Sequence, residues 1–205
     1  MRSDLWGEIV QLSAEHLLLV LITMVLAITI GLPLGIYLTR QPAARPWMLG
    51  FANILQTIPS LALLGFLIPI PFIGGIGKRT AVVALVLYAL LPILRNTFVG
   101  ILGVEAAVCE SAVEMGMTDG QLLRQVQIPL AAPTIMAGIR VATVTTIGTA
   151  TIAALIGGGG LGVFIFRGVS SLDTVQILAG AVPAALIALA ADGGLGWVER
   201  KLSPA

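Results

Sequence analysis

Residues 104–133 read VEAAVCESAVEMGMTDGQLLRQVQIPLAAP, and they differ from everything around them. The rest of the chain consists mainly of long apolar segments, whereas this stretch is amphipathic and carries four of the ten acidic residues. Its alanines and other small residues favour a short helix over 105–115, which Gly116 should break. Two helical pieces separated by a glycine predict an elbow that lies outside the apolar part of the protein.

The second half of this elbow carries its own start and stop signals. Thr118 and Gln121 have the spacing of a capping box, so a second short helix should begin there. Pro129 should end that helix, and Pro133 fits the first turn of the next long segment.

The bilayer is the main solvent for this chain. Of its 205 residues, 58% are hydrophobic and only 10% are charged, whereas a water-soluble domain carries roughly 25% charged residues. The net charge of +1 gives no reason to expect nucleic acid as a partner. The single cysteine excludes an internal disulfide and a metal cluster of thiolates.

Five apolar segments are long enough to cross a bilayer, which takes about 20 residues. We therefore predict an all-α membrane protein in which residues 1–205 form a single transmembrane domain. The N-terminus lacks a basic leader, so the first span should be a retained anchor. The expected spans are residues 17–38, 48–70, 80–100, 134–156 and 175–197.

Polar residues inside the spans are candidates for lining a path through the membrane, although they could also hold helices together. The second span contains a proline, which frees a backbone carbonyl for neighbouring hydroxyls to satisfy. The fourth span is dense in threonine, alanine and glycine, as expected of an inner helix that packs on other helices and on a second chain. The candidate path residues are Gln56, Thr57, Pro59 and Ser60 in the second span and Thr145 and Thr149 in the fourth.

Three ionisable residues in or beside the spans carry separate expectations. Arg95 would be costly at the bilayer centre, so it should sit near an interface or face protein. Arg140 should reach the interface or bond a neighbouring carbonyl. His16 should be a solvated residue at the outer end of the first span.

A glycine run, GGGGLG at 157–162, follows the fourth span. It lacks the Lys-Ser or Lys-Thr and the preceding strand of a phosphate-binding loop. We expect a flexible re-entrant turn at the outer side that acts as a gate, with Gly157 and Gly160 as its candidate residues.

The composition of the elbow favours a protein partner over the membrane surface. Ser111 and Ala112 are small enough for another surface to approach closely, and Glu110 could hold a cation on that surface. A linker lying on lipid headgroups would be rich in Lys and Arg, whereas this stretch has only Arg124.

The elbow resembles the EAA loop of permease subunits of bacterial ABC importers, which docks into the ATPase subunit. The matching pattern is Glu110-Ser-Ala, Gly116 after three further residues, and Val126-Gln-Ile-Pro129 after nine more. The resemblance implies that residues 104–133 couple the chain to an ABC ATPase. The residues that it implicates are Glu110, Ser111, Ala112, Gly116, Thr118, Asp119, Val126 and Pro129.

Four further motifs are QTIPS at 56–60, YALLPILRN at 88–96, MGMT at 115–118 and IGGGGLG at 156–162. They resemble the permeases of osmoprotectant importers, which carry glycine betaine, choline and carnitine. The resemblance implies the five-helix core of type I importers, a multi-pass place in the bacterial cytoplasmic (inner) membrane, and a transport subunit, not an enzyme. The alternative is a permease for another small solute, such as an amino acid or methionine.

The resemblance also implies partners that supply what this sequence lacks. There is no nucleotide-binding motif, so a separate ABC ATPase subunit should hydrolyse ATP, and no cofactor or metal is expected on this chain. The three Trp, two Tyr and six Phe are scattered, whereas a quaternary ammonium usually needs an aromatic cage. Solute recognition should therefore lie mainly in an extracytoplasmic substrate-binding protein, and a second permease chain, identical or homologous, should complete the path.

The basic residues predict an orientation. With the elbow in the cytoplasm, seven of the eleven Lys and Arg residues lie at or near the inside. Five spans then put the N-terminus outside and the C-terminus in the cytoplasm.

Two other classes of protein compete with a permease. An intramembrane enzyme needs converging catalytic groups, but this sequence has a single histidine, no HExxH motif and no pair of aspartates within a span. A channel or an ion-coupled carrier would use buried charges or inverted repeats, and no convincing repeat relates the two halves.

Overall fold

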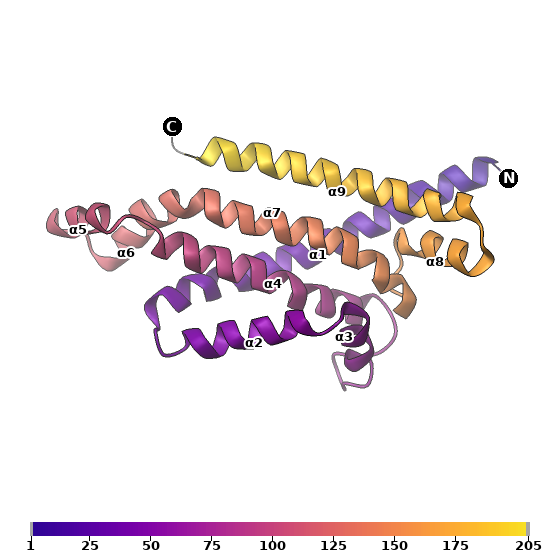
Figure 1. The fold of residues 1–205 in the computed structure, drawn as a ribbon, viewed down its shortest axis with the longest axis horizontal. Coiled ribbons are helices and arrows are strands. Elements are labelled where there is room, and N and C mark those ends of the chain that lie inside the picture. Colours follow the sequence, from indigo (N-terminus) through magenta and orange to yellow (C-terminus); the bar gives the residue numbers. More distant parts are fainter. Residues whose placement is uncertain (1, 204–205) are drawn as a thin grey trace.

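The computed structural model describes residues 2–203, and the side chains of residues 5–203. Every regular element in that range is a helix, which confirms the predicted all-α fold (Figure 1). In chain order the elements are α1 (Arg2–Arg40), α2 (Arg45–Thr57), α3 (Ser60–Leu67), α4 (Lys78–Leu102), α5 (Ala106–Glu114), α6 (Asp119–Gln121), the π-helical turn η1 (Leu122–Gln127), α7 (Ile128–Ile152), the 3₁₀ turn η2 (Ala153–Ile156), α8 (Gly162–Ser171) and α9 (Thr174–Leu202).

Four helical segments are long and apolar enough to cross a bilayer: α1, α4, the continuous stretch Asp119–Ile156, and α9. The pair α2 and α3 is the fifth candidate span, and it is bent by 103° at a short break. The bundle is elongated, with α5 and α6 at one end, which we call the elbow end, and α3 and α8 at the other, the far end (Figure 1).

The second expected span, 48–70, is not one continuous helix. A proline disfavours the helical conformation of the residue before it, and Ile58 is accordingly extended, with a ψ of 125°. The helix therefore ends before Pro59, and α3 starts again in a different direction. The break brings polar backbone groups into the middle of the second span.

Helix α1 begins well before the expected span at 17–38. It has 39 residues and is about 58 Å long. Its early turns pack at the far end of the bundle, where Leu12 joins Phe164 of α8 and Ala184 of α9 in a buried cluster. This apolar contact explains why the helix extends beyond the length that a bilayer requires.

Small residues let α4 pack closely against both α1 and α7, which are its main neighbours. A Cβ added to Gly35 of α1 would lie 2.6 Å from the Cβ of Thr97 in α4, so no larger residue fits there without a shift. Gly138 of α7 meets Asn96 of α4 in the same way. Close approach of this kind stabilises membrane helices, because lipid provides no hydrophobic drive for their association.

The backbone of the elbow follows the prediction except at its end. Helix α5 ends before Gly116, which has a left-handed φ of +87°, and Thr118 and Gln121 form the expected capping box. The expected stop at Pro129 is wrong, because the chain stays helical over Asp119–Ile156. The π-helical turn η1 widens the helix just before Pro129, so the proline ring is accommodated without a break.

Replacing Gly138 by alanine should lower the thermal stability of the protein. The added methyl would lie 2.5 Å from Asn96 Cβ and 2.8 Å from Pro92 O, so α4 and α7 would have to move apart. Overpacking of this kind costs about 1–3 kcal/mol. The measurement is the unfolding midpoint of the detergent-solubilised protein.

Gly194→Ala on α9 is the matched control, because nothing lies within 4 Å of a Cβ added there. Equal unfolding midpoints for the two variants would contradict the tight contact between α4 and α7.

Candidate translocation cavity and coupling elbow

A cavity of about 410 Å³ lies between α2, α4 and α7. Its volume falls within the roughly 300–1,000 Å³ of small-molecule sites. Three of the predicted path residues, Gln56, Thr145 and Thr149, line it. The other lining residues are Leu85, Tyr88, Leu91, Pro92, Arg95, Asn96, Val141 and Thr146.

The remaining predicted path residues do not line this cavity. Thr57 donates its hydroxyl to Ile54 O at 2.7 Å, within its own helix. Pro59 and Ser60 form the break and the first turn of α3. The structure thus brings together one residue of the QTIPS motif and the two threonines of the fourth span.

Two side chains that line the cavity donate hydrogen bonds to backbone carbonyls that a proline leaves without a helical partner. Pro92 has no N–H, so the carbonyl of Tyr88 one turn earlier loses its helical partner. Gln56 Nε2 donates to that carbonyl at 3.3 Å, and the Tyr88 hydroxyl donates to Ile58 O, at the break before Pro59. These bonds hold the broken second span against the proline-containing part of α4.

Arg95 was not among the predicted path residues, yet it lines the cavity. It lies about 10 Å along α4 from the end of that helix at Leu102. The ion pairs among residues 5–203 involve Lys78, Arg140 and Arg167, so none of them neutralises Arg95. An arginine inside an apolar span is the sequence signal that could have identified this residue, because such charges mark functional sites.

The glycine run packs against α1, and this corrects the expected environment of His16. The imidazole is fully buried, and its Nε2 lies 3.1 Å from Ile147 O of α7. Gly160, with a φ of +75°, leaves the necessary space, because a Cβ there would lie 2.9 Å from His16 Nδ1. His16 is therefore a buried link between α1 and α7. The gate role of Gly157 and Gly160 stays a prediction.

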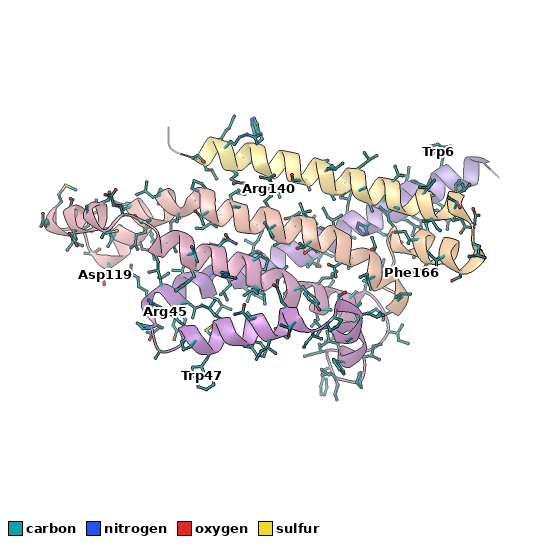
Figure 2. All side chains as sticks on the ribbon, in the orientation of Figure 1. Trp6, Arg45, Trp47, Asp119, Arg140 and Phe166 are labelled. Atoms are coloured by element: carbon teal, nitrogen blue, oxygen red, sulfur yellow. The ribbon has the colours of Figure 1, made fainter. Side chains whose placement is uncertain are left out.

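Arg140 forms ion pairs, which corrects the expectation of a contact with the interface or a carbonyl. Its guanidinium lies between α7 and α9 (Figure 2) and bonds both carboxylate oxygens of Asp192, at 2.7 and 2.8 Å. Nη1 also donates to Glu199 Oε2 at 3.2 Å. Gly196 makes room, since a Cβ there would lie 3.0 Å from Nη1. This bidentate geometry is the strongest form of arginine–carboxylate contact, and it fixes α9 on α7.

The elbow presents Glu110 and Ser111 to solvent on α5. Glu110 borders a surface cavity of about 350 Å³ together with Val113 and Glu114. Ala112, however, is only 3% exposed, so its small side chain does not offer a partner the close approach that we expected. Of the other predicted coupling residues, Gly116, Thr118, Asp119 and Pro129 are exposed and Val126 is half-buried.

The elbow is tied to α1 by a residue that the prediction did not include. Arg40, in the last turn of α1, donates from Nη2 to Asp119 O at 3.3 Å and to Gln127 Oε1 at 3.4 Å. Gln127 in turn lies 3.9 Å from the sulfur of Cys109 on α5. Arg40 therefore connects the end of α1 to the second half of the elbow, and Gln127 links that half to α5.

A family model described as "Binding-protein-dependent transport system inner membrane component" matches residues 27–204. The chain belongs to this family. It is a multi-span permease of the inner membrane, and its curated relatives are transport permease subunits.

Those relatives cover nearly the whole permease. It is 47% identical to the choline transport system permease protein OpuBB of Bacillus subtilis (strain 168), over 97% of this chain and 90% of that protein. It is 48% identical, with the same coverage, to the glycine betaine/carnitine/choline transport system permease protein OpuCB of that organism. The osmoprotectant import permease protein OsmW of Salmonella typhimurium is 43% identical over 97% of this chain and 93% of its own length. The resemblance to osmoprotectant permeases is confirmed.

Solved structures support the fold. The permease matches an inward-facing MetNI methionine ABC transporter with a TM-score of 0.89 at 22% identity, over 100% of both chains. An amino acid ABC transporter matches with a TM-score of 0.80 at 18% identity, over 98% of this chain and 96% of that one. Identities this low show the fold alone, and that fold is the predicted type I ABC permease core.

Reversing the charge of Arg140 should destabilise the permease, and a second reversal should restore much of the loss. Arg140→Asp places a third carboxylate beside Asp192 and Glu199, which should lower the unfolding midpoint by several degrees. Adding Asp192→Arg re-forms the pair with the opposite polarity. The measurement is thermal unfolding of the single and double variants.

Arg200→Asp is the control for charge reversal alone, because Arg200 is exposed near the end of α9. A double variant no more stable than Arg140→Asp would show that the ion pair does not hold α7 to α9.

Proposed function

We propose that this chain is the permease subunit of an ATP-driven importer of quaternary-amine osmoprotectants, the class that includes glycine betaine, choline and carnitine. The observation that carries the proposal is the 47% and 48% identity, over 97% of the chain, to permeases named for these solutes. The likeness to a methionine transporter does not favour methionine, because 22% identity supports only the fold.

In this proposal the permease works with three partners. An ABC ATPase docks on the elbow, where Glu110 and Ser111 are exposed. A second permease chain, identical or homologous, completes the path, and a substrate-binding protein delivers the solute from the opposite side of the membrane. The binding-protein-dependent transport named in the family description supports that last partner.

The proposed orientation places the elbow end in the cytoplasm. Helix α1 starts at the far end of the bundle and α9 returns toward the elbow end, so the N-terminus is outside and the C-terminus inside (Figure 1). Lys78 begins α4 and Arg167 lies in α8, both toward the far end, whereas Arg40 and Arg124 lie at the elbow. The seven of eleven Lys and Arg residues assigned to the elbow side from the sequence fit a cytoplasmic face.

The mechanism follows from how the elbow is attached. ATP-driven closure of the ATPase pair displaces the elbow, and Arg40 and the helix over Asp119–Ile156 carry that displacement to α1 and to the cavity wall. Packed helices shift between discrete arrangements, so the spans rock as rigid bodies. The cavity then opens toward the loaded binding protein, while the partner ATPase alone hydrolyses ATP.

Cells that lack other osmoprotectant importers should accumulate labelled glycine betaine, choline or carnitine when they express this permease with its ATPase and binding protein. Uptake should need ATP and should disappear without the permease. Labelled methionine serves as the competing solute. Uptake of methionine alone would replace the proposed solute class, and no uptake of any of the four would reject the proposal.

Glu110→Lys and Gly116→Leu should each separate ATP hydrolysis from uptake. The first reverses an exposed charge on the docking surface, and the second forces a branched residue into a left-handed backbone conformation. Losing a charged contact of about 1.5–3 kcal/mol lowers coupled uptake about tenfold or more. Uptake and ATPase activity are measured on the same proteoliposomes.

Arg200→Glu is the matched control, since it reverses an exposed charge outside the elbow. Uptake that stays at the level of the unaltered transporter in both elbow variants would exclude residues 110–116 from coupling.

A further inference from the structure

The polar side chains of the cavity between α2, α4 and α7 are mostly committed to the protein's own backbone. Gln56 bonds the carbonyl that Pro92 frees in α4, and Tyr88 bonds the carbonyl of Ile58 at the break before Pro59. Asn96 Nδ2 donates to Pro92 O at 2.8 Å. These three side chains hold the walls of the cavity in place.

Two of the three threonines of α7 that line the cavity are committed in the same way. Thr145 donates its hydroxyl to Val141 O at 2.8 Å, and Thr149 donates to Thr145 O at 2.7 Å. Such hydroxyls leave only their acceptor lone pairs toward the cavity. They cannot neutralise a cation that lines the same space.

Arg95 is the one charged residue among the described residues that line the cavity. No residue whose side chain is described forms an ion pair or a hydrogen bond with it. An intramembrane arginine needs a partner or access to water. Its planar guanidinium offers donors whose spacing matches a carboxylate. The exposed Arg95 side chain therefore gives the cavity a group suited to binding an anion.

The other walls of the cavity suit a quaternary ammonium group, which in a small zwitterion lies at the end opposite the carboxylate. Tyr88 precedes Arg95 by seven residues, two helical turns, so both lie on the same face of α4. The tyrosine ring can contact a quaternary ammonium through its face. Leu85 and Val141 add apolar surface for methyl groups.

We infer that this cavity binds carboxylate-bearing quaternary amines, with the carboxylate on Arg95 and the ammonium group toward Tyr88. The inference rests on the proposed function and narrows it. Glycine betaine and carnitine carry a carboxylate, whereas choline is a cationic alcohol that Arg95 repels. The permease therefore adds its own selection for zwitterions to that of the binding protein.

The test compares uptake of labelled glycine betaine, carnitine and choline by the whole transporter with Arg95→Gln or Arg95→Lys. Each rate is divided by that of the unaltered transporter for the same solute, which cancels the contribution of the binding protein. Arg95→Gln should lower the two zwitterion ratios about tenfold relative to the choline ratio. Arg95→Lys, which keeps the charge, should recover part of the loss.

Arg79→Gln, on the exposed outer turn of the same helix, controls for removal of a basic residue from α4. Membrane levels of every variant are measured by immunoblotting. Equal losses for all three solutes at normal membrane levels would overturn the inference. Uptake of choline alone by the unaltered transporter would also overturn it. An unaltered transporter that carries none of the three solutes would instead reject the proposed function, and this inference with it.

Discussion

A backbone carbonyl or N–H within a bilayer must find its partner inside the protein, because no water is available to replace it. The arrangement of α2, α4 and the end of α1 depends on this constraint. The carbonyl that Pro92 releases takes Gln56 as its donor. At the end of α1, Arg45 Nε donates to Leu38 O at 2.9 Å and Nη2 to Thr39 O at 2.7 Å. In both places the donor belongs to α2, so these bonds hold α2 against α1 and α4.

The same constraint separates structural polar groups from functional ones. A polar side chain that already donates its hydrogen bonds to backbone carbonyls has few donors available for a solute. Gln56, a predicted path residue, is of this kind, and the Tyr88 hydroxyl is also occupied, which leaves only the tyrosine ring for a solute. Arg95 lines the same cavity with its donors uncommitted among the described residues. A motif read along the chain cannot make this distinction, since it depends on which carbonyls lie nearby in space.

Local signals in the sequence predicted the elbow well, and long-range contacts account for most of what they missed. Gly116 and the Thr118–Gln121 box act within a few residues, so their effects could be read directly. His16 looked solvated because its burial depends on a glycine far along the chain. Arg140 looked like an interfacial residue because its carboxylate partner lies on another helix.

The proline errors have a different origin. Pro59 lies inside a long apolar segment whose hydropathy hid a bend of 103°. Pro129 was expected to stop a helix, but the π-helical turn before it absorbs the disturbance. Apolar length therefore located the candidate spans, while their straightness depended on backbone detail that hydropathy does not report. The position of the coupling residues on the surface followed from the elbow, except for Ala112, which the elbow itself covers.

The unbroken helix over Asp119–Ile156 has a mechanical consequence. Gly138, where α7 meets α4 most tightly, lies almost midway along it. A stiff beam held near its centre pivots about that point, so the two arms swing in opposite directions by similar amounts. In the proposed mechanism, movement imposed at Asp119 would therefore reappear, inverted, beside the glycine run some 50–60 Å away. The contact between Gly138 and Asn96 would be the pivot of that movement.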